Sequence, residues 1–459
     1  MSKRRIIYSF GIAIGMLLFS YWVTNQHFLL SGSEMGLMRY VELIKGTFYP
    51  QTRNNVPDSV MLINVSNDPT LIVTGSRDKK AIPKGYDLIT DRKKLLQLLE
   101  ELKRRNDYKY ILLDVYFSDS EDDQTDADSA LFNTIISMER IIIPRFYEEK
   151  LADERLNQKA GYVNYYTNFE FDSFSKFPYL IDDQQSLPLK MYEDLTGNHV
   201  DTHGIIPTEN SWPIRQSILL SFDIRLDIES TDREEGDTVW WNLGKDLLRC
   251  TFNDSIKGNE ELYNPNMSTN GKYIVIGAFS GNNDKHYTYI GNQPGAIILF
   301  NAFLVLMRQG HHIHILVFLV MLLVFWWMSY HILGEEKNAE KKIEEEKIEE
   351  EKVEGEKDEG EKKEWKEKAR EMAIKLLSST AKYANYTANF IASYAKYSFV
   401  LSLLAIITYI WMGVVYDIFI TALFFKFLRW IISLCRNKKQ TNRLWTFLKN
   451  RFSFLSLHG

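Results

Sequence analysis

Residue types that do chemistry in enzymes occur in this chain of 459 residues, but not in a known catalytic arrangement. The sequence has no phosphate-binding Gly-x-x-x-x-Gly-Lys-Ser/Thr loop, no nucleophile elbow, no His-Glu-x-x-His zinc motif and no kinase signature. Carboxyl and imidazole groups that could act as general acids or bases remain, chiefly Asp114, Asp284 and His286. We expect no enzymatic activity and no cofactor, and keep an enzyme centred on these three residues as an alternative.

An acidic run from Asp119 to Asp128 offers oxygen ligands of the type that calcium and magnesium use. The run lacks the glycine that the twelve-residue calcium loop needs at its sixth position. We therefore expect no metal there, and expect Asp126 to cap the helix that follows.

Three histidines, His311, His312 and His314, stand just before a long apolar run, and His286 precedes them. Imidazoles can bind a transition metal or respond to pH near neutrality. Polar anchoring at a membrane boundary is a simpler role, and we expect that role and no metal.

The elements that would position these residues include long apolar runs. Ile6 to Val23 has 18 residues and lacks an Ala-x-Ala cleavage site, which favours an uncleaved signal anchor over a signal peptide. The run from 313 to 333 has 21 residues and is the clearest predicted span. The region from 398 to 435 is too long for one span and predicts a hairpin of 398–416 and 418–434 with Asp417 at its turn, although one long tilted span is an alternative.

Orientation follows from the basic residues that flank these runs. Lys3, Arg4 and Arg5 place the N-terminal residues 1–5 in the cytoplasm, and a basic tail at 435–459 favours a cytoplasmic C-terminus. Residues 24–312 then lie outside. Cys250 and Cys435 fall in segments on opposite sides of the membrane or within it, so we expect no internal disulfide.

Two further segments lie between the second and third predicted spans. Residues 334–368 form a charged Glu/Lys-rich stretch whose five-residue repeats make no apolar seam, so it is a tether or a solvated helix, with a docking site for a basic partner as the alternative. Residues 369–397 predict an amphipathic helix that lies on membrane lipids or packs on a sister helix.

The outside domain alternates strands with amphipathic helices. Val60 to Val65, Tyr110 to Val115 and Arg140 to Ile143 predict strands, with helices at 91–105 and 126–138 between them. Such alternation predicts an α/β domain with a partly parallel sheet. Residues 145–270 show weak periodicity and predict strands with irregular excursions. A strand at 272–277, a loop to Pro294 and a helix at 295–308 close the domain.

A set of motifs in this domain resembles the type-two CHASE domain family, the extracellular sensors attached to many bacterial cyclases and histidine kinases. The motifs are Asp91-Arg92 at the first helix, Asp114 and Phe117 after a strand, and a closing signature of Asp284, His286, Thr288, Pro294, Gly295 and Asn301. The resemblance implies that these residues bind a ligand or belong to motifs that the family shares. It departs at Asn64 to Asp68, where the family has an acidic pair, and at Tyr289, where it usually has proline.

The resemblance implies an α/β extracytoplasmic sensor-like domain, joined here to a helical membrane region of about four spans in the bacterial inner membrane. Family members usually end in a catalytic output domain, whose motifs are missing here, so we expect a separate signalling or membrane protein as partner. The formal charge of −5 gives no reason to expect nucleic acid. Gly11 and Gly15 would permit a homodimer through the first span. A structural component of an inner-membrane complex is the alternative.

Overall fold

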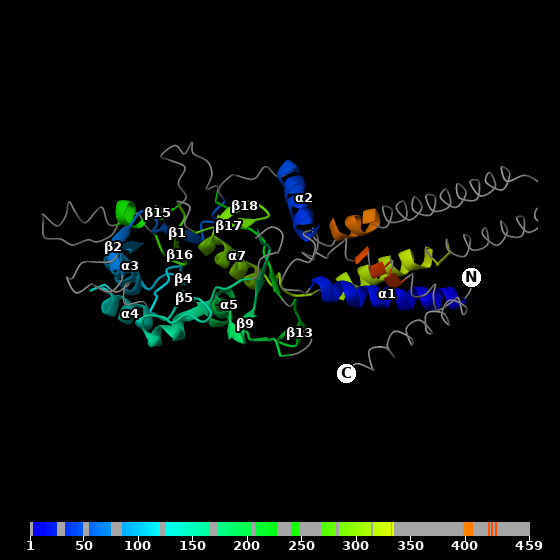
Figure 1. Cartoon of the computed structure of the whole chain (residues 1–459), viewed down its shortest axis with the longest axis horizontal. Coiled ribbons are helices and arrows are strands. Elements are labelled where there is room, and N and C mark those ends of the chain that lie inside the picture. The colour runs from blue at the N-terminus through cyan, green and yellow to red at the C-terminus, as the bar shows by residue number, and fades with distance from the viewer. Residues whose placement is uncertain are drawn as a thin grey trace, which may run out of the picture. The chain divides into compact units, whose positions relative to one another are not determined.

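The chain divides into two compact units, one of residues 25–313 and the other of residues 1–24 with 314–459. The computed structural model (Figure 1) describes residues 3–24, 33–48, 55–74, 85–119, 125–165, 173–203, 207–215, 217–226, 240–247, 268–280, 284–313, 315–331, 333–334, 398–406, 421–422, 424–425 and 427–428. The predictions for 334–397, for the turn at Asp417 and for the tail at 435–459 fall almost entirely outside these ranges.

The larger unit is built on a six-stranded sheet in the order β15-β1-β16-β4-β5-β6. Every pairing in this sheet is parallel, so the prediction of a partly parallel sheet is confirmed and extended. The central strands are near-continuous apolar runs, so other elements must cover both of their faces. The strands are β1 (Val60–Asn64), β4 (Tyr110–Leu113), β5 (Ile141–Arg145), β6 (Ala160–Tyr162), β15 (Trp241–Asn242) and β16 (Tyr273–Gly277).

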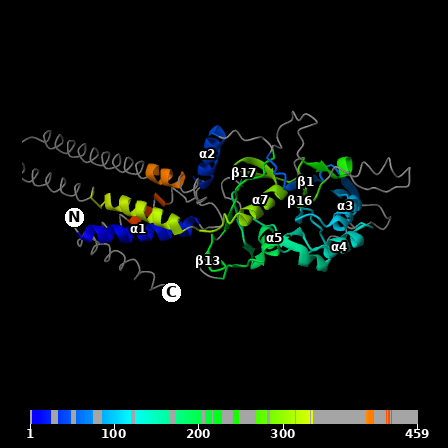
Figure 2. The same ribbon diagram turned by 180° about the vertical axis from the view of Figure 1, so that it is seen from behind.

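Helices cover the two faces of this sheet (Figures 1 and 2). On one face, α3 (Arg92–Arg105) and α4 (Asp128–Ser137) bury their leucines and isoleucines in one core with alternate residues of the strands. On the other face lie α5 (Leu187–Thr196) and α7 (Gly295–Met307). The rings of Phe300 and Phe303 of α7 pack against Tyr273 of β16, with centroids 5.7 and 5.5 Å away. Burial on both faces makes the sheet a rigid base for residues at its edges.

The predicted strands and helices of the first half are confirmed to within two residues, but two hairpins and the helices α2 (Ser33–Phe48) and α5 were not predicted. An antiparallel hairpin of β2 (Pro69–Thr74) and β3 (Gly85–Thr90) separates β1 from α3. Helix α5 lies within the stretch that was expected to hold only strands and excursions. The loop expected to end at Pro294 contains a second hairpin, β17 (Lys285–Thr288) and β18 (Gly291–Pro294).

Short strands and turns fill the rest of this unit, as the weak periodicity of 145–270 predicts. They are the helical turns η2 (Glu154–Lys159) and η3 (Leu243–Leu247) and the strands β7 (Ser173–Phe174), β8 (Lys176–Pro178), β9 (Leu180–Ile181), β10 (Gln184–Gln185), β11 (Val200–Asp201), β12 (Thr208–Glu209), β13 (Trp212–Pro213) and β14 (Ser217–Leu219).

The smaller unit contains α1 (Lys3–Thr24) and a shorter apolar helix, Ile315–His331. Among the described residues, α1 is the one helix long and apolar enough to cross a membrane, over Arg5–Trp22. The two helices run antiparallel: the Arg5 guanidinium donates to the Tyr330 carbonyl oxygen at 3.0 Å, and the indole of Trp326 donates to the Ser9 hydroxyl at 3.0 Å.

A third segment packs on α1 in the same unit. The ring of Phe424 stacks on Phe19 with centroids 3.7 Å apart, and a Cβ added at Gly15 would lie 3.6 Å from Leu428. Phe424 lies beside Phe19, and Leu428 lies beside Gly15, which comes earlier in α1. This segment therefore runs antiparallel to α1.

Candidate functional site

The carboxyl ends of β1, β4 and β16 lie next to one another at one edge of the parallel sheet. Asn64 ends β1, Asp114 follows β4, and Asp284 lies on the connection from β16 to α7. The helices that follow β4 and β16 go to opposite faces of the sheet. Ligands of open α/β sheets bind at such switch points.

Asp284 lies over the first turn of α7. Its Oδ2 accepts a hydrogen bond from the Gly295 backbone N–H at 3.1 Å, and its Oδ1 lies 3.1 Å from Nε2 of His286. The unpaired N–H groups and the positive end of the helix dipole stabilise the carboxylate there. A Cβ at residue 295 would come within 2.8 Å of both Asp284 oxygens, so only glycine leaves room for this cap.

Asp114 lies close to the same helix start. Gly277 makes this approach possible, because a Cβ there would meet the Cβ of Ala296 at 2.8 Å and that of Asp114 at 3.4 Å. Loss of hydration at the edge of the sheet, together with the negative charge of Asp284, raises the pKa of Asp114 to about 8. The edge therefore presents a protonated carboxyl group next to a second aspartate at neutral pH.

Asn64, the last residue of β1, organises the neighbouring loops. Its fully buried amide accepts hydrogen bonds from the backbone N–H groups of Ser66 and Phe279 and donates to the side chains of Asn242 and Ser280. An asparagine can both donate and accept, whereas an ionised aspartate only accepts. The sequence marked this position only as a departure, and its network joins segments more than 170 residues apart.

The motif residues of the first helix fasten the starts of α3 and α4 to each other. Asp91 caps α3, where its side chain accepts from the N–H groups of Lys93 and Lys94. Arg92 is buried, pairs with Asp128 at 2.6 Å and lies 5.5 Å from the centre of the Phe117 ring. These residues join α3 to the start of α4.

Thr288, Pro294 and Asn301 also serve the backbone. The Thr288 hydroxyl donates to the Gly291 carbonyl and closes the β17–β18 turn. Pro294 is the N-cap residue of α7. Asn301 is fully buried within α7 and binds the backbone of residues 223 and 224. The structure thus brings Asp114, Asp284, His286 and Gly295 together, with Pro294 beside them, and joins Arg92 to Phe117 in a second group.

The expectation that Asp126 caps a helix is wrong. The N-cap residue of α4 is Ala127, which makes no side-chain cap hydrogen bond. Asp128, the first residue of α4, instead accepts from the N–H and hydroxyl of Thr125 and pairs with Arg92. Its oxygens are thereby engaged, and residues 120–124 of the acidic run lie outside the described part of the chain.

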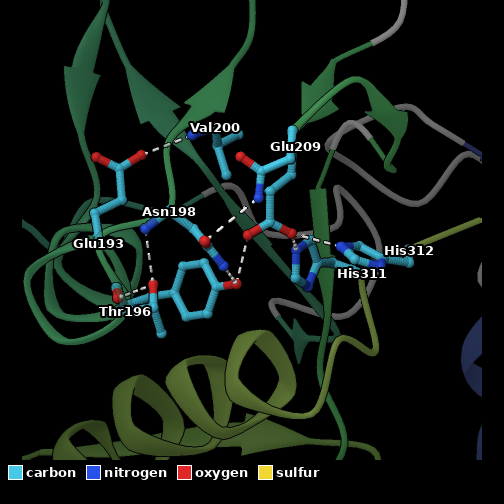
Figure 3. A network of polar contacts seen from close by, with 9 residues as sticks. Glu193, Thr196, Asn198, Val200, Glu209, His311 and His312 are labelled. Atoms are coloured by element: carbon cyan, nitrogen blue, oxygen red, sulfur yellow. Dashed lines mark hydrogen bonds and ion pairs between the residues drawn. The ribbon is translucent and has the colours of Figure 1, made fainter.

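The histidines after α7 form a second cluster (Figure 3). The Nε2 atoms of His311 and His312 lie 2.9 and 2.5 Å from the same Glu209 oxygen, Oε2. Because His311 is fully buried in the larger unit, the expected role in polar anchoring at a membrane boundary is wrong for this residue. His286 belongs to the other end of α7, and His314 is outside the described residues.

The protonation states in this cluster follow from its surroundings. Burial raises the pKa of the Glu209 carboxyl, but hydrogen bonds from Tyr192, His312 and His311 outweigh burial and bring the pKa below its ordinary value. Burial lowers the pKa of His311 to about 4, against the opposing effect of Glu209. Near neutral pH a carboxylate therefore faces a neutral His311. Glu209 was not recognised from the sequence, where nothing connects it with residues 102 positions later.

A family model of the CHASE2 domain matches residues 37–333. The chain belongs to the CHASE2 domain family. This is a family of extracellular sensor domains, so the suspected resemblance is confirmed and the coarse role of the domain is sensing. No curated protein and no solved structure matched the chain. The matched region contains the edge with Asp114 and Asp284, the Glu209 cluster and the Ile315–His331 helix.

Proposed function

We propose that this chain is a membrane-anchored sensor whose extracytoplasmic CHASE2 domain binds a ligand at the Asp114–Asp284 edge and passes its state through membrane helices to a separate partner. The observation that carries the proposal is the pair of acidic side chains at the N-terminus of α7. A protonated carboxyl, a second aspartate and an imidazole supply both donors and acceptors to a small polar ligand.

Helix α7 provides a path away from this site. It begins at Gly295, under the Asp284 cap, and its residues are buried almost throughout. Its C-cap residue Arg308 pairs with Asp223 at 2.5 Å, and five residues later the larger unit ends at Ile313. A ligand that displaces Asp284 removes the cap of a helix that is covalently continuous with the next predicted span.

Contacts within the smaller unit support the membrane anchoring. The antiparallel pairing of α1 with Ile315–His331 agrees with two spans that cross in opposite directions. Residues 424–428 also run antiparallel to α1, as the hairpin model requires and the single long span does not. We therefore retain four spans, a cytoplasmic C-terminus and a bacterial inner-membrane location as parts of the proposal.

Hydrogen–deuterium exchange on the full-length chain in lipid nanodiscs tests the proposed path. Asp284→Asn keeps the size of the side chain but removes the charge at the helix start. We expect faster exchange at residues 284–295 that extends along α7 to residues 308–313. Asp201→Asn, a change at an exposed position of β11, is the matched control and should leave α7 unchanged.

The same variants test whether a separate partner reads the domain. We expect a membrane protein crosslinked to the wild-type chain in native membranes to be recovered in a different amount with Asp284→Asn and in the same amount with Asp201→Asn. If Asp284→Asn changes neither α7 exchange nor partner recovery, the chain is a structural component and not a sensor.

One observation favours a second candidate function, catalysis at the same edge. A carboxyl group whose pKa is raised to about 8, next to a second aspartate, is an arrangement that acid and base catalysts use. An extracytoplasmic enzyme would lose turnover of its substrate by orders of magnitude in Asp114→Asn, whereas a sensor would keep a bound ligand chemically unchanged. Mass spectrometry of candidate ligands after incubation with the purified chain separates the two functions.

A further inference from the structure

Three side chains with metal-binding atoms converge at the end of the larger unit where the chain leaves it. They are Glu209 on β12 and His311 and His312 after α7, and their ligand atoms all lie within 4.8 Å of one another (Figure 3). We propose that Glu209, His311 and His312 form a site for one divalent transition-metal ion of the zinc class.

The donor set fits this ion. Two imidazoles and one carboxylate, with a fourth position open, are a recurring zinc arrangement, and zinc binds these atoms at about 2.0 to 2.2 Å. Ligand atoms around a tetrahedral ion are then roughly 3.3 Å apart. The present Nε2 to Oε2 separations of 2.9 and 2.5 Å are shorter, so an ion requires the three groups to open by less than about 1 Å. His312, whose side chain is 22% exposed, has room to move.

The backbone already holds the ligands in place. The N–H of Arg215 donates to the His311 carbonyl oxygen at 3.0 Å, Ile214 pairs with His312 as an antiparallel bridge, and the N–H of Ile313 donates to Pro213 at 3.2 Å. The segment that carries the histidines is thus fastened beside the β12–β13 hairpin that carries Glu209. Ligands on paired strands lose little freedom when an ion binds.

Groups outside the ligand set orient the carboxylate. Tyr192 donates to the other Glu209 oxygen, Oε1, at 2.5 Å, and Asn198 donates to the Tyr192 hydroxyl at 3.0 Å (Figure 3). This leaves Oε2 directed at the histidines. Carboxylates that bind metals are usually held by hydrogen bonds of this kind.

An unpaired atom gives a second, independent reason to expect a ligand. Nδ1 of His311 is buried and has no hydrogen-bond partner among the described residues, and the same is true of the Tyr179 hydroxyl. The two rings lie 6.4 Å apart between centroids. An unsatisfied buried polar group costs about 1 to 3 kcal/mol and calls for an explanation such as a bound ion.

A bound ion would join the β12–β13 hairpin to the residues that lead to the second predicted span. Metal loading would then stiffen this connection, whatever ligand the Asp114–Asp284 edge binds. The proposal is independent of the sensor role, because metal binding is measured directly and needs neither a signal nor a partner.

Titration of ZnCl2 into the full-length, tag-free chain in detergent after removal of metals with a chelator tests the site. We expect one Zn²⁺ per chain by calorimetry, a Co²⁺ complex with visible absorption bands typical of a four-coordinate site, and a higher unfolding temperature with Zn²⁺. His312→Gln and Glu209→Gln should weaken binding at least about tenfold, since each removes a ligand.

Two histidine variants are matched controls. His199→Gln removes a side chain that is 77% exposed and lies beside Glu193, and His286→Gln removes the other histidine that contacts a carboxylate near α7. Both should bind Zn²⁺ as tightly as the wild type.

The proposal is overturned if the wild-type chain binds no stoichiometric Zn²⁺ or Co²⁺, or if His312→Gln binds as well as His199→Gln. A hydrogen-bonded structural cluster would behave differently. The chain would then bind no metal, and His312→Gln would lower the unfolding temperature by the same amount with and without Zn²⁺. Because His312 is partly exposed, its variant is the one expected to fold if Glu209→Gln does not.

Discussion

At the carboxyl end of β4, Asp114 keeps a proton over a pH range in which an unfolded aspartate has lost it. Its pKa is raised from 3.8 to about 8 by loss of hydration and by the charge of Asp284. The folded state binds a proton that the unfolded chain releases, so stability is fully present below pH 4 and falls as the pH rises toward 8. One such proton lowers the free energy of unfolding by at most about 1.4 kcal/mol for each pH unit.

This linkage predicts the behaviour of Asp114→Asn. The variant should lose the fall in stability between about pH 5 and pH 8. Denaturant unfolding of the full-length chain in detergent, repeated across this range, measures the slope. Asp119→Asn, at an exposed position five residues later, should keep the wild-type slope. Equal slopes for wild type and Asp114→Asn would show that Asp114 is ionised at neutral pH.

Among the elements, α7 runs from the Asp114–Asp284 edge toward the end of the larger unit, and one residue anchors it. Asn301 accepts from the N–H groups of Asp223 and Ile224 at 2.9 and 3.0 Å and donates to the Ile224 carbonyl at 2.9 Å. Its place in the closing motif therefore reflects packing of the helix against residues 222–226.

Asn301→Leu should destabilise the chain strongly. Leucine keeps the branched shape but is larger, and it leaves two buried backbone groups and one partly buried group without partners, at about 1 to 3 kcal/mol each. We expect a loss of at least about 3 kcal/mol in denaturant unfolding and faster hydrogen exchange at residues 222–226. Leu304→Ala, on the same helix at a half-buried position, should lower stability without this local change. An unchanged exchange rate at 222–226 would contradict the anchoring role.

At the scale of the whole molecule, the number of spans decides which side of the membrane the C-terminus faces. The four-span proposal places Gln158 outside and Lys449 in the cytoplasm. We expect Gln158→Cys, in a background with Cys250→Ser and Cys435→Ser, to react with a membrane-impermeant maleimide in intact spheroplasts. Lys449→Cys should react only after the membrane is permeabilised. Reaction of Lys449→Cys in intact spheroplasts would favour the single long span instead.

The sequence by itself determined the central strands of the sheet and the helices α3 and α4, because strand and helix formation depends largely on residues close together in the chain. Apolar runs predicted β1, β4 and β16, and leucines spaced at three and four predicted α3, all within two residues. The order of motifs also identified the family before any contact was known, since motifs are read in sequence.

Only the tertiary structure decided which distant segments meet. It inserted β16 between β1 and β4, so that Asp284 and Asp114 share one edge, and it placed Glu209 against two histidines 102 and 103 positions later. Periodicity carries no information about such pairings, because they depend on how the chain crosses the sheet and how loops without regular pattern pack. The carboxyl pair and the Glu209 cluster are therefore consequences of topology, built from residues whose types were visible and whose proximity was not.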